Sequence, residues 1–120
     1  MAEPEASAKK ENYAEEVPEG AAVVPVIPES AGVSPLFLAL FHALVFLEGS
    51  SEEVIDPSAA DEAAEYLATY LQRLSGEDLQ NLRKDLNRLL EHARRNKWSK
   101  DQLDFIQNFT HQFGIGEIKS

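Results

Sequence analysis

The stretch 35-PLFLALFHALVFLE-48 decides the fold, because it is a long apolar run with helix signals at both ends. Ser34 precedes Pro35, and a hydroxyl residue followed by proline is typical of a helix N-terminus, where the missing proline N–H costs nothing. Gly49 follows the run and favours a helix stop. These residues predict a helix over 35–48.

This predicted helix is apolar on nearly every side, whereas a surface helix normally carries one apolar stripe. At about 100° per residue, one face holds Leu36, Phe37, Leu40, Ala43, Leu44 and Leu47. The second face holds Leu38, Phe41, His42, Val45 and Phe46. His42 is the one polar residue between Leu36 and Leu47. We expect it to be partly buried with one hydrogen-bond partner or to lie at the rim of an interface.

Three more helices are predicted towards the C-terminus, each introduced by an N-cap residue. The first of them has two possible N-caps, Asp56 before Pro57 or Ser58 with Asp61 three residues later, and Ser75 precedes the second. Ser99 with Gln102 forms a capping box before the third, and Gly114 ends it. The four predicted helices cover about 35–48, 57–74, 76–95 and 100–113. The predicted fold class is therefore all-α, a small four-helix bundle.

Residues 1–34 differ in composition from the rest, with four of the six prolines and seven glutamates against two lysines. Such a segment has little apolar surface to offset its chain entropy, so we expect a disordered acidic tail before a helical domain at 35–120. The glutamates that precede any apolar run also argue against a secretory signal. Within the tail, the apolar segment Val23–Ile27 has three open interpretations: a linker, a strand that docks on a partner, or a flap folded back over the domain.

The very short connection at 75–76 predicts that the helices 57–74 and 76–95 pack as an antiparallel hairpin. Residues 48–65 are acidic without a lysine or arginine, and 83–100 are rich in bases. The hairpin would place these two segments side by side. The expected ion pairs join Arg94, Arg95 and Lys97 to Asp56, Asp61 or Glu62.

Composition excludes several kinds of chemistry. Eleven bases against 21 acids leave a net charge of −10, which argues against a protein that neutralises nucleic-acid phosphates. The absence of cysteine excludes disulfides, thiolate nucleophiles and cysteine-ligated zinc, and it favours a cytoplasmic setting. The three histidines fall on different predicted helices, and no Gly-rich phosphate loop occurs. We expect no catalytic, cofactor or metal site and no enzymatic activity.

The predicted function is a non-enzymatic protein–protein interaction or adaptor module, including self-association as a homo-oligomer. The predicted interface is the second face of the first helix: Leu38, Phe41, His42, Val45 and Phe46. A membrane is not the expected partner, because 14 helical residues span only about 21 Å. Two alternatives to an interface stay open for the second face of this helix: the other three helices could wrap around it, or the tail could fold back over it. Two stay open for the function: an acidic inhibitor that mimics nucleic-acid phosphates, and a small enzyme.

Overall fold

The computed structural model describes residues 17–117, and over that range the chain is all-helical, which confirms the predicted fold class. A short 3-10 helix, η1, precedes the α-helices. The elements are η1 (Glu29–Ala31), α2 (Pro35–Gly49), α3 (Pro57–Leu71), α4 (Gly76–Arg95), α5 (Lys100–Gln107) and α6 (Phe109–Gln112). The predicted tail residues 1–16 lie outside the described residues.

All four predicted helix starts are correct, and at two of them, before α3 and α5, the predicted side-chain cap is formed, whereas Ser34 and Ser75 make no side-chain capping bond. The Asp56 carboxylate accepts a hydrogen bond from the Ala59 N–H at 3.0 Å. Ser99 and Gln102 form both bonds of the predicted capping box, at 3.2 Å and 2.9 Å. Each of these caps satisfies helix N–H groups that have no partner within the helix.

Two predicted helix ends differ from the structure. The helix expected over 57–74 ends at Leu71, and the Gln72 side chain then donates a hydrogen bond to the Phe113 carbonyl at 2.9 Å. The helix expected over 100–113 is interrupted at Asn108, whose φ and ψ of −99° and 8° leave the helical region. Asn is a weak helix former, which is consistent with a break at this position.

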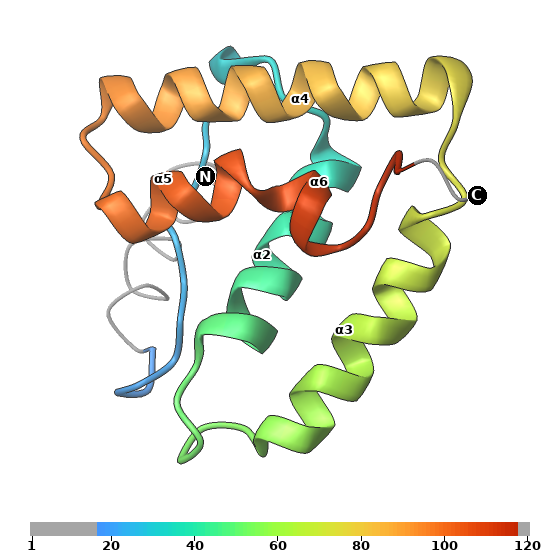
Figure 1. The fold of residues 1–120 in the computed structure, drawn as a ribbon. Helices are drawn as coiled ribbons and strands as arrows, with labels where there is room; N and C mark the ends of the chain where they lie inside the picture. The colour runs from blue at the N-terminus through green and yellow to red at the C-terminus, as the bar shows by residue number, and fades with distance from the viewer. Residues whose placement is uncertain (1–16, 118–120) are drawn as a thin grey trace, which may run out of the picture.

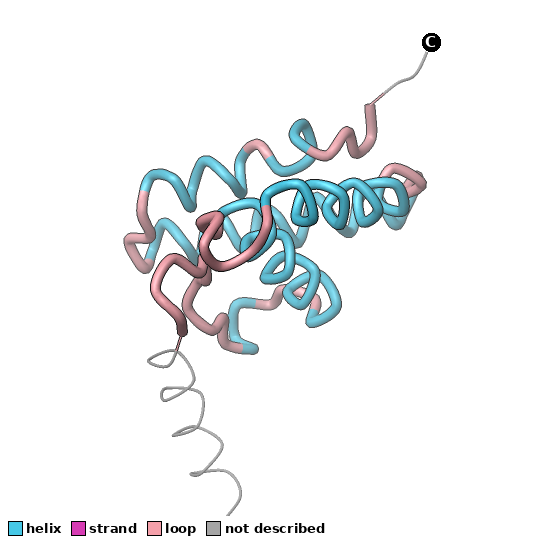
Figure 2. The backbone as a smooth tube through the Cα atoms, turned by 90° about the horizontal axis from the view of Figure 1, so that it is seen from below, coloured by secondary structure: helices cyan, strands magenta, loops and turns pink. Residues whose placement is uncertain are grey.

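The α-helices form two antiparallel pairs that cross each other (Figure 1): α2 packs along α3, and α4 packs along α5. The predicted hairpin between 57–74 and 76–95 is therefore wrong. After Ser75 the chain turns at Gly76, whose φ is +53°, and α4 leads away from α3 (Figure 1). Figure 2 shows the described residues from below as helices joined by loops, without a strand. Side-chain size explains the pairing, because the buried residues of α3 are small and let α2 approach α3 closely. They are Ala60, Ala64 and Ala68.

Phenylalanine rings from three helices fill the centre of the core. Phe37 and Phe41 come from α2, Phe105 from α5 and Phe109 from α6. Phe109 is 0% exposed, and its ring centre lies 5.6 Å from that of Phe37 and 5.0 Å from that of Phe113. Tilted and edge-on ring pairs of this kind add to the stabilisation from burial.

Residues 17–33, here called the strap, belong to the folded domain, so the predicted tail does not extend to residue 34. Val24 and Ile27 are buried in the core, whereas their neighbours Val23 and Val26 are exposed. This spacing follows from the prolines, which favour an extended helix of about three residues per turn with one side against the domain. Both ends of the strap are held by hydrogen bonds. The Ala22 N–H donates to Ser50 Oγ at 2.9 Å, and Arg88 Nη1 donates to the Gly32 carbonyl at 3.1 Å.

A matched pair of substitutions tests the docking of the strap. Val24→Ala removes buried methyl groups, so we expect it to lower the free energy of unfolding by about 2 kcal/mol. Val23→Ala removes the same atoms from a side chain that is 48% exposed and should change stability by less than about 0.5 kcal/mol. Urea denaturation followed by circular dichroism measures both values. Equal effects of the two changes would show that the strap does not dock.

Candidate functional site

The second face of α2, predicted as an interface, is largely covered by the protein's own chain. Phe41 is only 1% exposed, and its ring centre lies 5.7 Å from that of Phe105, so it is not available to a partner. Leu38 and Val45 are half-buried and pack against the core cluster that contains Val24 of the strap. Of the interpretations of Val23–Ile27, the structure therefore shows the flap folded back over the domain.

His42 and Phe46, the remaining predicted interface residues, are half-buried at the border between the covered and the open sides of α2. The His42 ring meets the Phe41 ring edge-on, with their centres 6.2 Å apart. Burial lowers the pKa of His42 because it disfavours the charged imidazolium. The neutral imidazole adds no charge to this side of the helix.

The open side of α2 is a different one from that predicted. Leu36 is 84% exposed, and Ala39 and Ala43 are exposed as well. Together with the half-buried Phe46 they occupy one arc of the helix without a charged residue, and we call these four residues the α2 outer face. Leu36 and Ala43 belong to the first of the two predicted faces, whereas the predicted interface is the second face. The arrangement has a physical reason: the bulky Phe37, Phe41 and Leu44 fill the core, which leaves the side with two alanines to the solvent.

Two tyrosines of α3 extend this apolar surface. Tyr66 and Tyr70 are 64% and 61% exposed and lie one helical turn apart. The Arg73 guanidinium lies 4.9 Å from the centre of the Tyr70 ring, a cation–π geometry. Asp61 and Glu65, on the opposite flank of α3, line a hollow with α6. By helix periodicity the tyrosines and the α2 outer face therefore lie on the side of the α2–α3 pair that α6 does not cover.

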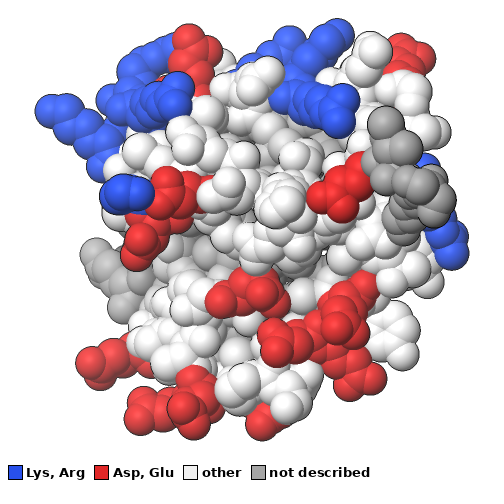
Figure 3. All heavy atoms as spheres, viewed as in Figure 1, with Lys and Arg blue, Asp and Glu red and all other residues white. Residues whose placement is uncertain are grey.

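Charge is separated along the molecule (Figure 3). Lysines and arginines gather along α4, and the acidic residues gather at the far end, where α2 ends and α3 begins. The predicted ion pairs between these groups are not formed, because α4 leads away from α3. The described residues instead form short-range pairs: Arg95–Glu91 at 3.1 Å, Lys100–Asp104 at 2.8 Å and, when the histidine is protonated, His111–Glu117 at 3.4 Å.

The basic helix α4 is anchored at the start of α2. The buried Asp85 carboxylate accepts a hydrogen bond from the Ser34 N–H at 3.1 Å, which caps α2 from another element. The predicted N-cap residue, Ser34, stands at the expected position, but its own side chain makes no capping bond. Arg88 lies one turn from Asp85 and donates a hydrogen bond to the Gly32 carbonyl, shortly before α2 begins. The bases of α4 are therefore near Leu36, at the start of α2.

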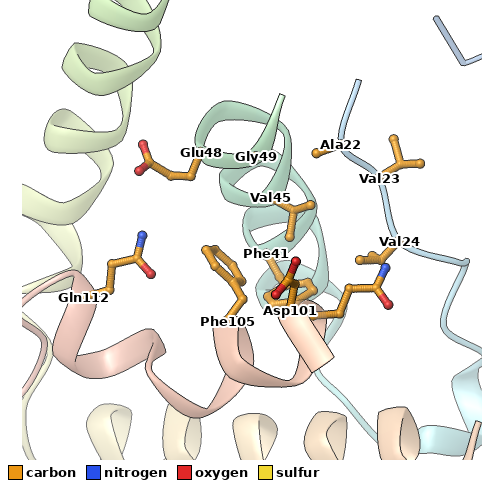
Figure 4. A pocket seen from close by; sticks show the side chains of 11 residues that line it. Ala22, Val23, Val24, Phe41, Val45, Glu48, Gly49, Asp101, Phe105 and Gln112 are labelled. Atoms are coloured by element: carbon orange, nitrogen blue, oxygen red, sulfur yellow. The ribbon is translucent and has the colours of Figure 1, made fainter. Parts of the chain in front are cut away.

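A hollow of about 340 Å³ opens between the strap, α2 and α5 (Figure 4). Phe41, Val45 and Phe105 supply its apolar lining, and Glu48 and Asp101 bring carboxylates to it. Burial raises the pKa of Glu48, and the nearby Asp61 raises it further, because both disfavour the charged form. No sequence signal marked this hollow, since its residues come from segments far apart in the chain.

Among residues 17–117 no group of three or more histidine, cysteine, aspartate or glutamate side chains is placed to hold a metal ion. In the same range, no helix combines the length and apolar character needed to cross a membrane. The features that remain for function are the α2 outer face with its tyrosines, the separated charges and the hollow.

The raised pKa of Glu48 predicts a pH-dependent effect of Glu48→Gln. A carboxyl group whose pKa is higher in the folded than in the unfolded chain lowers stability as the pH rises through the interval between the two values. We therefore expect Glu48→Gln to raise the melting temperature at neutral pH and to have no such effect at a pH below that interval. Glu62→Gln, on the exposed side of α3, serves as the control. Thermal denaturation across this pH range tests the prediction, which an unchanged or lower melting temperature at neutral pH contradicts.

Comparison of the chain with models of protein families, with curated proteins and with solved structures finds no significant match.

Proposed function

We propose that the protein is a non-enzymatic interaction module that pairs with a second copy of itself through the α2 outer face and the adjacent Tyr66 and Tyr70. One observation carries the proposal: Leu36 is 84% exposed at one end of a helix face without charged residues. Burial of such a leucine in an interface contributes about 1.5–3 kcal/mol. Solvent-exposed apolar residues that are contiguous on a surface mark contact sites.

The tyrosines support the same surface. Tyrosine is enriched in protein interfaces because a large rigid ring buries much area at a small cost in conformational entropy, while its hydroxyl stays hydrated at the rim. The small Ala39 and Ala43 leave room for a second helix to approach α2 closely. An apolar centre with tyrosines beside it is the composition expected of a contact site.

Charge complementarity favours a second copy as the partner. Asp85 of α4 binds the Ser34 N–H at the start of α2, so the neighbouring Lys84 lies near one end of the outer face, and the acidic residues Glu52, Glu53 and Asp56 follow the other end. A two-fold axis near the middle of α2 reverses the direction of the second copy. Each acidic end then meets the basic end of the other molecule, which stabilises this arrangement over a parallel one.

The acidic end also supports a second candidate function, an inhibitor that occupies the basic nucleic-acid site of another protein. The observation in its favour is that residues 48–65, which contain no lysine or arginine, lie away from the bases of α4 (Figure 3). Such an inhibitor would lose binding when Glu52, Glu53 and Asp56 are neutralised and would keep it in Leu36→Glu. Self-association through the outer face would instead be lost in Leu36→Glu.

Light scattering after gel filtration tests self-association. We expect the wild-type chain to have twice the monomer mass at high micromolar concentration and Leu36→Glu to have the monomer mass, since burying an unpaired carboxylate opposes association. Val26→Glu places the same charge on a strap residue that is 58% exposed and should leave the dimer intact. Circular dichroism verifies that both variants are folded. A wild-type protein that stays monomeric contradicts the proposal.

Charge reversal tests the arrangement of the two copies. Lys84→Glu alone and Glu53→Lys alone should each weaken the dimer, because each brings like charges together. Mixed in equal amounts, the two variants should form a heterodimer, since both contacts between the basic end of one copy and the acidic end of the other then join opposite charges, one of them with the signs exchanged. Native mass spectrometry of the mixture distinguishes this species. Dimers of wild-type affinity in both single variants would contradict the antiparallel arrangement and leave self-association itself standing.

A further inference from the structure

The hollow shown in Figure 4 continues into a second one on the same side of the molecule. The second hollow has a volume of about 480 Å³ and lies between α3 and α6. Both hollows are lined by Glu48 and Gln112, which therefore form the boundary between them. The two hollows adjoin at these residues, and we call them together the trough, with a first part beside the strap and a second part beside α3.

The trough alternates apolar surface with carboxylates. Phe41, Val45 and Phe105 line the first part, beside Asp101 and Glu48. Ala64, Ala68 and Phe113 line the second part, beside Asp61 and Glu65. The first part, which is mainly apolar with two carboxylates, has the composition of small-molecule sites, whose volumes begin at about 300 Å³, and the second part is mainly polar.

The charges of the trough have one sign. Its four carboxylates belong to Glu48, Asp61, Glu65 and Asp101, and neither part of its lining includes a lysine or arginine. The nearby Lys100 Nζ is bound to Asp104 at 2.8 Å, and His111, at the far end, faces the Glu117 carboxylate at 3.4 Å. The trough therefore attracts cations and repels anions.

We propose that this trough binds a linear aliphatic oligoamine, with one ammonium group between Asp101 and Glu48 and another near Asp61 and Glu65. The methylene chain of the ligand would pass Gln112 and contact Phe105 in the first part and the alanines of α3 in the second. The proposal does not depend on self-association, because the trough lies on the side of the α2–α3 pair opposite the outer face.

The arrangement of charges and apolar groups selects this ligand class over other cations. A single metal ion needs several oxygen ligands converging on one point, and residues 17–117 hold no group placed to do so. A short monoamine occupies only one part of the trough and leaves the other pair of carboxylates without a counter-charge. An ammonium beside Glu48 also compensates a carboxylate whose pKa burial and Asp61 have raised.

Isothermal titration calorimetry with spermidine tests the proposal, on the full chain and at physiological ionic strength. We expect saturable binding with one ligand per chain. Glu48→Gln removes the carboxylate shared by both parts and should weaken binding about tenfold, the loss expected for one charge-assisted hydrogen bond. Glu62→Gln removes the same charge from the exposed side of α3, outside the trough, and should leave the affinity unchanged. Circular dichroism verifies the fold of both variants.

Three results would overturn the proposal. The absence of saturable spermidine binding does so directly. Equal weakening by Glu48→Gln and Glu62→Gln, or complete competition by the same concentration of Mg²⁺, would show only diffuse attraction to an acidic protein. Leu36→Glu should bind spermidine like the wild type, so that a failure of self-association and a failure of the trough are seen separately.

Discussion

The structure depends on the need to cover a helix that is apolar on almost every side. Burying both Phe41 and Leu44 of α2 requires neighbours on several sides at once. In this domain α3 covers one side, the phenylalanines of α5 and α6 cover a second, and the strap covers a third. The strap is therefore part of the core and not an appendage, since without it Phe41 and Val45 would face water.

The crossing of the two helix pairs follows from the same requirement. If α4 had paired with α3, the leucines of α4 would have been drawn away from α5, and the centre of the phenylalanine cluster would have lacked a cover. With α4 placed across the start of α2, Leu82, Leu86 and Leu89 close the core from above. Asp85 on the same helix caps α2 at Ser34, so one contact orients both pairs.

The separation of charge is a consequence of this crossing and underlies both proposals. Because α4 leads away from α3, no ion pair within residues 17–117 joins the acidic residues of 48–65 to that helix. On the open side of α2 this polarity supports the proposed pairing of the outer face with a reversed copy. On the opposite side it leaves the trough around Glu48 without a lysine or arginine among its lining residues.

The sequence by itself determined the helical class and the four helix starts, two of which have a cap, Asp56 or the pair of Ser99 and Gln102, that acts within one turn. Only the tertiary structure decided that Leu36 faces water while Phe41 does not, that Val24 joins the core, and that Glu48 and Asp101 line one hollow. These outcomes depend on which elements meet, and α2 offered apolar residues in every direction. Periodicity ranks the sides of a helix by polarity, so it cannot choose among sides that are equally apolar, and the choice passes to the shapes and sizes of the packing partners.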